Sequence, residues 1–245
     1  ALYYARDDWL SSPARRQYWP AYREAYRRIA ASGRAVAAVS QEIIDRIEPR
    51  GPHAVVPNGI EPVEWLSAQP TAPRWFEKIP GPRAVYVGTL DSRLDIDGLV
   101  RLARARLELH LVLIGPAPSA KFIAPLREET NIHIRGEVGR AEVVAVLRNN
   151  EITLLAHRTT PLTEAMSPLK VYEYLAAGRP VLATDLRPVR GLGPSVHLAS
   201  TVTDFIDLVD DALAQGIQSE SARADFVSAN AWTTRHQEIL GLIDG

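Results

Sequence analysis

Short apolar runs alternate with longer amphipathic stretches along most of this chain. The runs have the length and composition of buried strands, whereas the stretches keep the three- and four-residue spacing of helices. Strands are predicted at Leu2–Ala5, Ala35–Val39, His53–Val56, Ala84–Val87, His110–Ile114, Asn131–Ile134, Ile152–Ala156, Val181–Ala183 and Val196–Leu198. Helices are predicted at Ala14–Ala31 with a break near Pro20, Gln41–Ile47, Asp95–Arg106, Ala120–Glu128, Arg140–Arg148, Pro168–Ala177, Val202–Ala214, Ser219–Ser228 and Thr233–Ile243. The alternation predicts an α/β fold with a Rossmann-like, doubly wound parallel sheet.

The same pattern divides the chain into four parts. Residues 1–60 hold three short strands and two helices, as expected for the C-terminal remnant of an α/β domain whose beginning is absent. Residues 61–82 contain five prolines without periodicity and are predicted to be a linker. Residues 83–228 carry the regular alternation and form the second domain, and 229–245 form a last helix.

Composition narrows the function classes. The chain is 46% hydrophobic and 23% charged with a formal net charge of −1, so total charge gives no case for nucleic acid or an anionic membrane. No apolar run approaches the ~20 residues that span a bilayer, and no transmembrane segment is predicted. There is no cysteine, which excludes disulfides and Cys-ligated metals, and the six histidines show no local metal-ligand spacing.

The stretch from Ser167 to Gly178 reads as one short helix, with Ser167 as its N-cap, Pro168 in its first turn and Gly178 beyond its end. Lys170 opposes the helix dipole, and an anion bound at the helix start would reverse that penalty. Glu173 leaves the same flank and is an acceptor suited to sugar hydroxyls. The flank therefore suits a nucleotide sugar, although a plain surface Lys–Glu pair is the alternative.

Ligands of an open parallel sheet bind beyond the carboxyl ends of its strands. The loop after Val87 has one glycine, Gly88, and lacks the three-glycine fingerprint of NAD or FAD domains. Gly88 permits close backbone approach to a ligand, and Arg93 is a candidate for a phosphate or for a surface pair with Asp95 or Asp97.

Two further loops follow strands. The loop 135–139 begins with Arg135 and includes Val138, and its glycines permit the tight path of a base-binding pocket or of a plain turn. His157 and Arg158 follow the fourth strand of the second domain, where they are candidates for phosphate or sugar contacts. A single histidine is also common as a structural group.

Four segments occur in an order that resembles retaining glycosyltransferase family 4, which has the two-domain GT-B architecture. They are the turn Val56-Pro57-Asn58-Gly59-Ile60-Glu61, the glycine loop after Val87, Leu113-Ile114-Gly115-Pro116, and the block from Ser167 to Thr184. The resemblance covers the chain from about Ala35 to its end.

The resemblance implies a donor nucleotide in the second domain. Glu173 would hydrogen-bond the ribose, Lys170 and Arg93 would hold the diphosphate and act in catalysis, and Gly88 would let the phosphates approach. Ser167 and Leu169 would border the same site, and Arg135 and Val138 would line the base. Glu164 lies one residue from the first position of the family's Glu-x7-Glu pair and is a further candidate for a sugar contact. Members of the family are generally metal-independent. The resemblance also implies that the last helix, residues 229–245, crosses back to the N-terminal domain.

These observations together predict a glycosyltransferase that moves a sugar from a nucleoside diphosphate, UDP being the expected carrier, with retention and without a cofactor. The acceptor is open among a glycan, a lipid-linked molecule and a small molecule, and the remaining N-terminal domain or a partner chain is expected to complete the protein. A non-catalytic sugar-nucleotide-binding subunit and a GT-B-type nucleotide-sugar epimerase are the alternatives. A cytoplasmic location is expected, with peripheral attachment to the inner membrane face as its variant.

Overall fold

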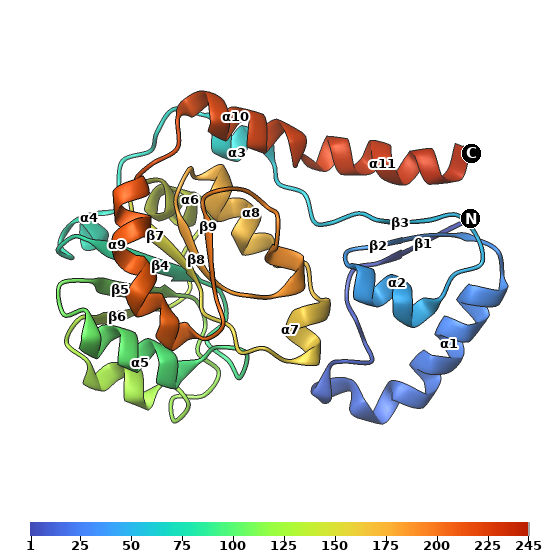
Figure 1. The fold of residues 1–245 in the computed structure, drawn as a ribbon, viewed down its shortest axis with the longest axis horizontal. Coiled ribbons are helices and arrows are strands. Elements are labelled where there is room, and N and C mark those ends of the chain that lie inside the picture. The colour runs from blue at the N-terminus through green and yellow to red at the C-terminus, as the bar shows by residue number, and fades with distance from the viewer. Residues whose placement is uncertain (245) are drawn as a thin grey trace.

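The computed structural model describes residues 1–244, and two parallel sheets organise them (Figure 1). The smaller sheet has the order β1-β2-β3, formed by Leu2–Ala5, Ala35–Ala38 and His53–Val55. We call residues 1–60, which contain this sheet, the small lobe. Its core lies between the strands and two helices, α1 (Trp19–Ala31) and α2 (Gln41–Ile47), with Val36, Ala38 and Ile43 fully buried.

The larger sheet has six parallel strands in the order β6-β5-β4-β7-β8-β9. Its strands are β4 (Arg83–Val87), β5 (His110–Ile114), β6 (Ile132–Arg135), β7 (Ile152–Leu155), β8 (Val181–Thr184) and β9 (Val196–Ala199). We call residues 83–228 the large lobe. The strand order reverses between β4 and β7, as in a doubly wound fold. The predicted Rossmann-like α/β class is therefore confirmed.

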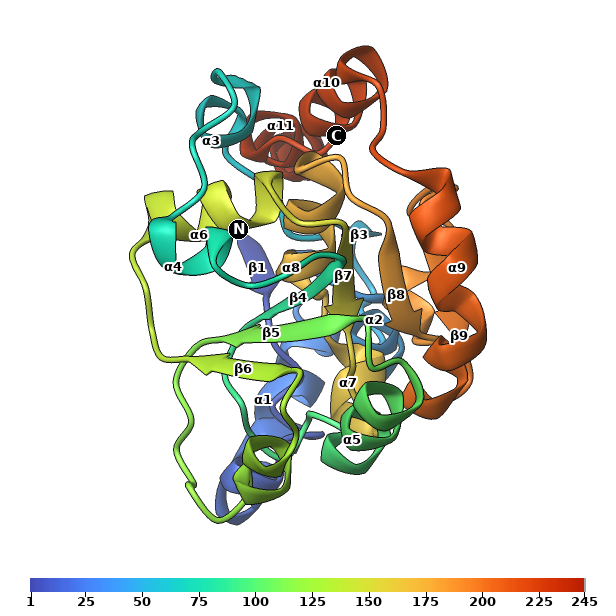
Figure 2. The same cartoon turned by 90° about the vertical axis from the view of Figure 1, so that its left-hand side faces the viewer.

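Helices cover both faces of the large sheet, because its strands are apolar on both sides. Figure 2 shows α5 and α9 on one side and α4 and α6 on the other. The helices are η1 (Pro13–Tyr18), α1 (Trp19–Ala31), α2 (Gln41–Ile47), α3 (Pro62–Leu66), α4 (Arg74–Glu77), α5 (Ile96–Ala105), η2 (Ala124–Glu128), α6 (Arg140–Arg148), α7 (Pro161–Ala165), α8 (Leu169–Ala176), η3 (Arg187–Val189), η4 (Val202–Asp204), α9 (Phe205–Gln215), α10 (Glu220–Ala229) and α11 (Trp232–Asp244).

Two predicted segments differ from the structure. The helix predicted over Ala120–Glu128 is only the 3₁₀ turn η2, since Pro125 near its start has no N–H to continue an α-helical ladder. Residues 61–82, predicted as a linker, carry α3 and α4. Trp65 and Phe76 in these helices are fully buried against the large sheet, so apolar anchors outweigh the prolines there.

The two lobes touch at several points, and α11 lies over the small sheet (Figure 1). The Ser40 hydroxyl of the small lobe donates to the Ala165 carbonyl at 2.6 Å, and Asn58 contacts Ser167. Ile60 pairs with the backbone around Ala231 and so ties the start of segment 61–82 to α11. Within residues 1–244, no helix combines the length and the apolarity needed to cross a membrane.

Candidate nucleotide-sugar site

The first turn of α8 stands at the carboxyl ends of β4 and β7. Gly88 directly follows β4, His157 lies two residues beyond β7, and both contact Lys170 of α8. Most other α8 side chains are buried, so the helix is fixed between the sheet and α10. A cation is thereby held at the edge of the sheet where ligands of this fold bind.

Lys170 makes only neutral contacts through its ammonium group. Nζ lies 3.2 Å from Nε2 of His157 and 3.3 Å from the hydroxyl of Tyr86, and it also sits 4.7 Å from the centroid of the Tyr86 ring. No carboxylate within residues 1–244 forms an ion pair with it. Lys170 is thus a positive charge held by one imidazole and one phenol.

The surroundings make this charge costly. Removal from water, together with the nearby Arg93 guanidinium, lowers the pKa of Lys170 from 10.5 to about 7. Burial, and then the charges of Lys170 and Arg93, hold the pKa of His157 well below its usual range. His157 is therefore neutral and offers an acceptor nitrogen to Lys170. The charges of Asp91 and Glu173 offset the lowering of the Lys170 pKa only in part, so an anion bound beside Lys170 would stabilise its charged form.

The absence of a side chain at Gly88 leaves the space that the Lys170 ammonium group occupies. Its φ is +148°, and a Cβ there would lie 2.9 Å from Lys170 Nζ and 3.2 Å from the Tyr86 hydroxyl. Any larger residue would therefore displace the ammonium group. The side chain nearest to this glycine is therefore Lys170, and the close approach of a ligand to the Gly88 backbone stays a prediction.

Arg93 is partly engaged. Its Nε and Nη2 donate to the two oxygens of Asp91 at 2.9 and 2.7 Å, and both side chains are about a third exposed. Neither Asp95 nor Asp97, the partners considered from the sequence, pairs with it. Those carboxylates face Arg158 instead, each at 3.8 Å.

Glu173 is buried and bound to an arginine that the sequence did not single out. Nη1 of Arg140 lies 2.5 Å from Oε1 of Glu173, and the same guanidinium donates to Glu64 at 3.0 and 2.6 Å. Burial raises the pKa of Glu173 despite this pairing. Lys170 and Glu173 thus leave the same helix but have different partners, and neither projects into bulk solvent.

His157 has no exposed surface, whereas Arg158 is half exposed. The structure thus brings His157 to Lys170 and directs Arg158 toward Asp95 and Asp97. His157 Nδ1 has no hydrogen-bond partner among the described residues. His157 is therefore placed to hold the Lys170 ammonium group and not to contact a ligand directly.

The loop 135–139 after β6 was expected to line the base, and its residues make the following contacts. Arg135 is exposed, and its guanidinium carbon lies 4.9 Å from the centroid of the Trp75 ring. Val138 is partly buried and packs on the core near α6. Gly139 has a φ of −66° and precedes α6, and neither it nor Gly136 adopts positive φ. The loop therefore does not use the positive φ values that its glycines permit, and the base-binding role stays a prediction.

Three expected site residues have other contacts. The Ser167 hydroxyl accepts from the Asn58 backbone N–H at 3.2 Å, and the residue preceding α8 is Pro168, so the predicted N-cap is wrong. Leu169, expected to border the site, is 38% exposed at the helix start. Glu164 accepts from the Arg187 backbone N–H at 3.0 Å, because the turn η3 lies beside α7.

Sequence reasoning missed Tyr86 and Arg140. Tyr86 lies in β4 and is buried, yet its hydroxyl reaches Lys170. Its signal was a polar tip inside an otherwise aliphatic strand. Arg140 opens the helix after the 135–139 loop, at the same edge of the sheet as Glu173, and its position there was the available clue.

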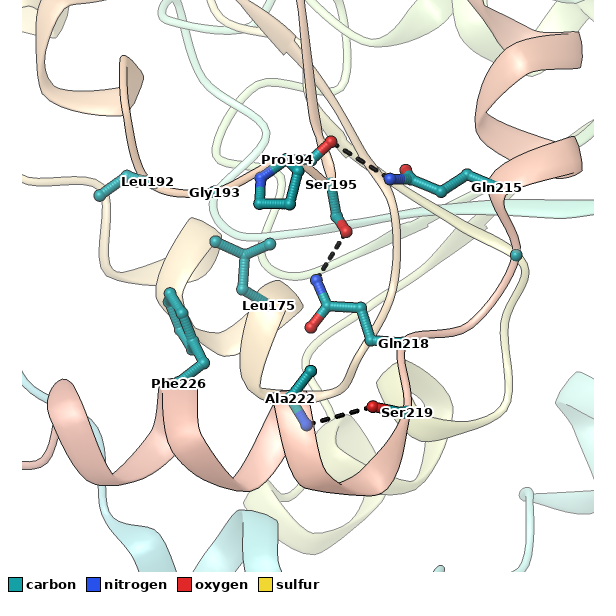
Figure 3. A pocket seen from close by; sticks show the side chains of 11 residues that line it. Leu175, Leu192, Gly193, Pro194, Ser195, Gln215, Gln218, Ser219, Ala222 and Phe226 are labelled. Atoms are coloured by element: carbon teal, nitrogen blue, oxygen red, sulfur yellow. Dashed lines mark hydrogen bonds between the residues drawn. The ribbon is translucent and has the colours of Figure 1, made fainter.

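Two cavities adjoin this edge. One of about 430 Å³ is lined by His157, Arg158 and Thr184 among others, and one of about 370 Å³ lies between the lobes beside Arg93. The pocket in Figure 3 differs, since it lies at the amino ends of β8 and β9. There Gln218 donates to the Ser195 hydroxyl at 2.6 Å, so its polar groups satisfy one another. Among residues 1–244, no three His, Cys, Asp or Glu side chains are grouped to hold a metal ion.

Comparison with protein families gives a match at the large lobe. The family described as Glycosyl transferases group 1 matches residues 81–215. A curated relative is the putative teichuronic acid biosynthesis glycosyltransferase TuaH of Bacillus subtilis (strain 168), 27% identical over 135 residues. That alignment covers 54% of this chain and 34% of the relative, so the chain matches about a third of that protein.

Solved structures share the fold of both lobes. Sucrose-phosphate synthase from Thermosynechococcus elongatus superimposes with a TM-score of 0.74 at 17% identity, covering 99% of this chain and 67% of that one. Trehalose-6-phosphate synthase from E. coli, bound with UDP-2-fluoro glucose, gives a TM-score of 0.70 at 14% identity, covering 98% and 67%. At these identities the likeness concerns the fold alone.

Proposed function

Because this chain belongs to the glycosyl transferases group 1 family, we propose that it binds a nucleoside diphosphate-sugar at the first turn of α8. The proposal rests chiefly on Lys170, a partly buried ammonium group whose hydrogen-bonding contacts among residues 1–244 are all neutral. A diphosphate would supply its counter-charge, and a desolvated site strengthens that attraction. The free N–H groups at the start of α8 would add to it.

Each neighbouring residue has a part in this proposal. Lys170 stabilises the diphosphate as it leaves the sugar, and Arg93 adds a second cation after releasing part of its contact with Asp91. Glu173 holds the ribose hydroxyls through the oxygen that Arg140 leaves free. Arg135 and Val138 line the base, and Gly88 keeps the backbone close to the phosphates.

The whole protein, on this proposal, transfers the sugar to an acceptor with retention, as the resemblance to glycosyltransferase family 4 implies, and without a metal ion. We propose UDP as the carrier. A UDP-sugar analogue bound to a solved structure of similar fold supports that choice. Peripheral contact with a membrane is compatible with this function.

A thermal-shift panel of UDP, GDP and ADP tests donor binding directly. A ligand at about 100 times its Kd stabilises the folded state by about 2.7 kcal/mol, and for a chain of this size that raises Tm by roughly 5–10 °C. We expect UDP to give the largest shift and inorganic phosphate a small one. If no nucleoside diphosphate raises Tm, the proposed site is wrong.

Stereochemistry is tested on the complete enzyme with an α-linked donor. The anomeric proton of the product, followed by NMR from the first turnovers, should show the α configuration. A β product would refute retention while leaving donor binding intact.

A further inference from the structure

The small lobe carries a local positive charge that the whole chain does not. Residues 13–34 include six arginines and a single glutamate, while the chain as a whole has a formal net charge of −1. All six arginines are exposed, and they belong to or adjoin η1 and α1. Such an asymmetry within a near-neutral protein points to an anionic partner for this surface.

Aromatic rings are interleaved with these arginines. The Arg15 guanidinium lies 5.5 Å from the Trp9 ring, and those of Arg16 and Arg23 each lie 5.9 Å from the Trp19 ring. Tyr22 connects the group, with ring centroids 6.0 Å from Trp9 and 6.2 Å from Tyr18. We call Trp9, Arg15, Arg16, Tyr18, Trp19, Tyr22 and Arg23 the arginine–aromatic surface.

The cations of this surface lack carboxylate partners. Among the described residues, Arg15, Arg16 and Arg23 take part in no ion pair, whereas Arg27 and Arg28 share Glu24. Other exposed arginines do pair, as Arg190 does with Asp185, but what sets this surface apart is three arginines, unpaired within residues 1–244, gathered around aromatic rings. The charge of the arginine–aromatic surface is therefore available to a partner.

We propose that the arginine–aromatic surface docks on an anionic phospholipid bilayer. Trp and Tyr rings are favoured at the membrane interface, where an apolar body meets a polar edge, and arginines beside them attract anionic headgroups. The 3₁₀ turn η1 is exposed throughout, and Tyr18 is 47% exposed within it. A single-stranded nucleic acid would match the same charge, so the test below includes it as a competing outcome.

The surface reaches the cleft between the lobes. Pro13 and Trp19 line the cavity of about 370 Å³ that Arg93 also borders. A bilayer docked here would therefore lie next to that cavity. If the proposed donor site is correct, an acceptor carried on a lipid would reach it from this side, but bilayer binding itself does not depend on that site.

Vesicle co-sedimentation of the 245-residue chain tests the proposal. The chain should sediment with mixed phosphatidylcholine–phosphatidylglycerol vesicles, remain free with pure phosphatidylcholine vesicles, and be released as salt is raised. An arginine near an anionic surface contributes about a fivefold gain in binding, so the triple variant Arg15→Gln, Arg16→Gln, Arg23→Gln should bind roughly 100-fold more weakly.

A matched control removes the same charge elsewhere. Arg74, Arg101 and Arg127 are exposed and lie outside the small lobe, so their triple replacement by Gln should leave vesicle binding within about threefold of the original. Thermal melts establish that both variants fold. Absence of binding to anionic vesicles, equal loss in the control variant, or preference for single-stranded RNA over vesicles would each overturn the proposal.

Discussion

The two ends of helix α8 treat polar groups in opposite ways. At its start, the Lys170 ammonium group has hydrogen-bond contacts, within the described part of the chain, to an imidazole and a phenol and to no carboxylate. Past its end, the backbone turns at Gly178 with a φ of +75°, and the Ala176 carbonyl accepts from Arg223. The pocket of Figure 3 borders this second end, and Gln218 and Ser195 satisfy each other there.

This contrast separates a ligand site from a structural cavity of similar size. A buried polar group with its partners supplied by the protein stabilises one conformation. A buried charge without a counter-charge costs stability and persists where a ligand completes it. Cavity volume alone would not have chosen between the two ends of α8.

The largest expected effect is loss of donor binding on removal of the Lys170 charge. Truncating one member of a desolvated charge pair typically costs about 2–5 kcal/mol, so Lys170→Met should weaken UDP binding roughly 100-fold. Isothermal titration calorimetry measures this. Lys121→Met is the control, because Lys121 is exposed and far along the sequence from α8, and its Kd should be unchanged. If Lys170→Met binds UDP as tightly as the original protein does, the start of α8 is not the ligand site and the contrast between the two helix ends is lost.

Glu173 should distinguish the nucleoside from the phosphates. Its role on the ribose predicts that Glu173→Gln weakens UDP binding about tenfold, the range for a hydrogen bond to a charged group. Inorganic pyrophosphate, which has no ribose, should bind this variant as it binds the original. If the variant binds UDP and pyrophosphate more weakly by the same factor, Glu173 acts through the structure around Arg140 and not on the ribose.

The same lysine should destabilise the ligand-free protein. Its pKa is about 7 in the folded state against 10.5 ordinarily, so between these values the unfolded chain binds more protons and stability rises with pH. Below about pH 7 the penalty is present in full. Lys170→Met should therefore melt at least ~2 °C higher at about pH 6, with little difference at about pH 10. A lower Tm at the acidic pH would show that the charge is already compensated.

The smallest effect on binding is expected at the other end of α8. Gln218→Ala removes the donor to Ser195, which should cost about 1 kcal/mol and lower Tm by roughly 2–4 °C. UDP affinity should stay within about twofold, because distant sites act independently. A large loss of affinity would mean that the two ends of α8 are coupled.

The amino-acid pattern carried most of the fold and part of the site. All nine strands were predicted within a residue or so, because most of them are short apolar runs bounded by polar or turn residues. Trp65 and Phe76 were missed since prolines around them dominate the local signal, although each is a core anchor. The helix at Lys170 was predicted from Pro168 at its start and Gly178 beyond its end.

The ion-pair and hydrogen-bond partners of the site residues could not be predicted from local sequence patterns. Arg93 pairs with Asp91 rather than with Asp95 or Asp97, and Glu173 pairs with Arg140. The paths of the loops decide which charged side chains face each other. Ser167 was expected to cap its own helix, but the Asn58 N–H from the small lobe occupies its hydroxyl. Such contacts follow from the packing of the lobes, which no window of the sequence contains.

Proton uptake on donor binding tests the central claim most directly. At about pH 8 a lysine with a pKa near 7 is mostly neutral, and a diphosphate that requires its charge must bring about 0.9 proton with it. Calorimetric titration with UDP-glucose, in buffers of different ionisation enthalpy, measures that number. The account predicts uptake of nearly one proton at about pH 8 and of about 0.1 at about pH 6. Binding without proton uptake at the higher pH would contradict it.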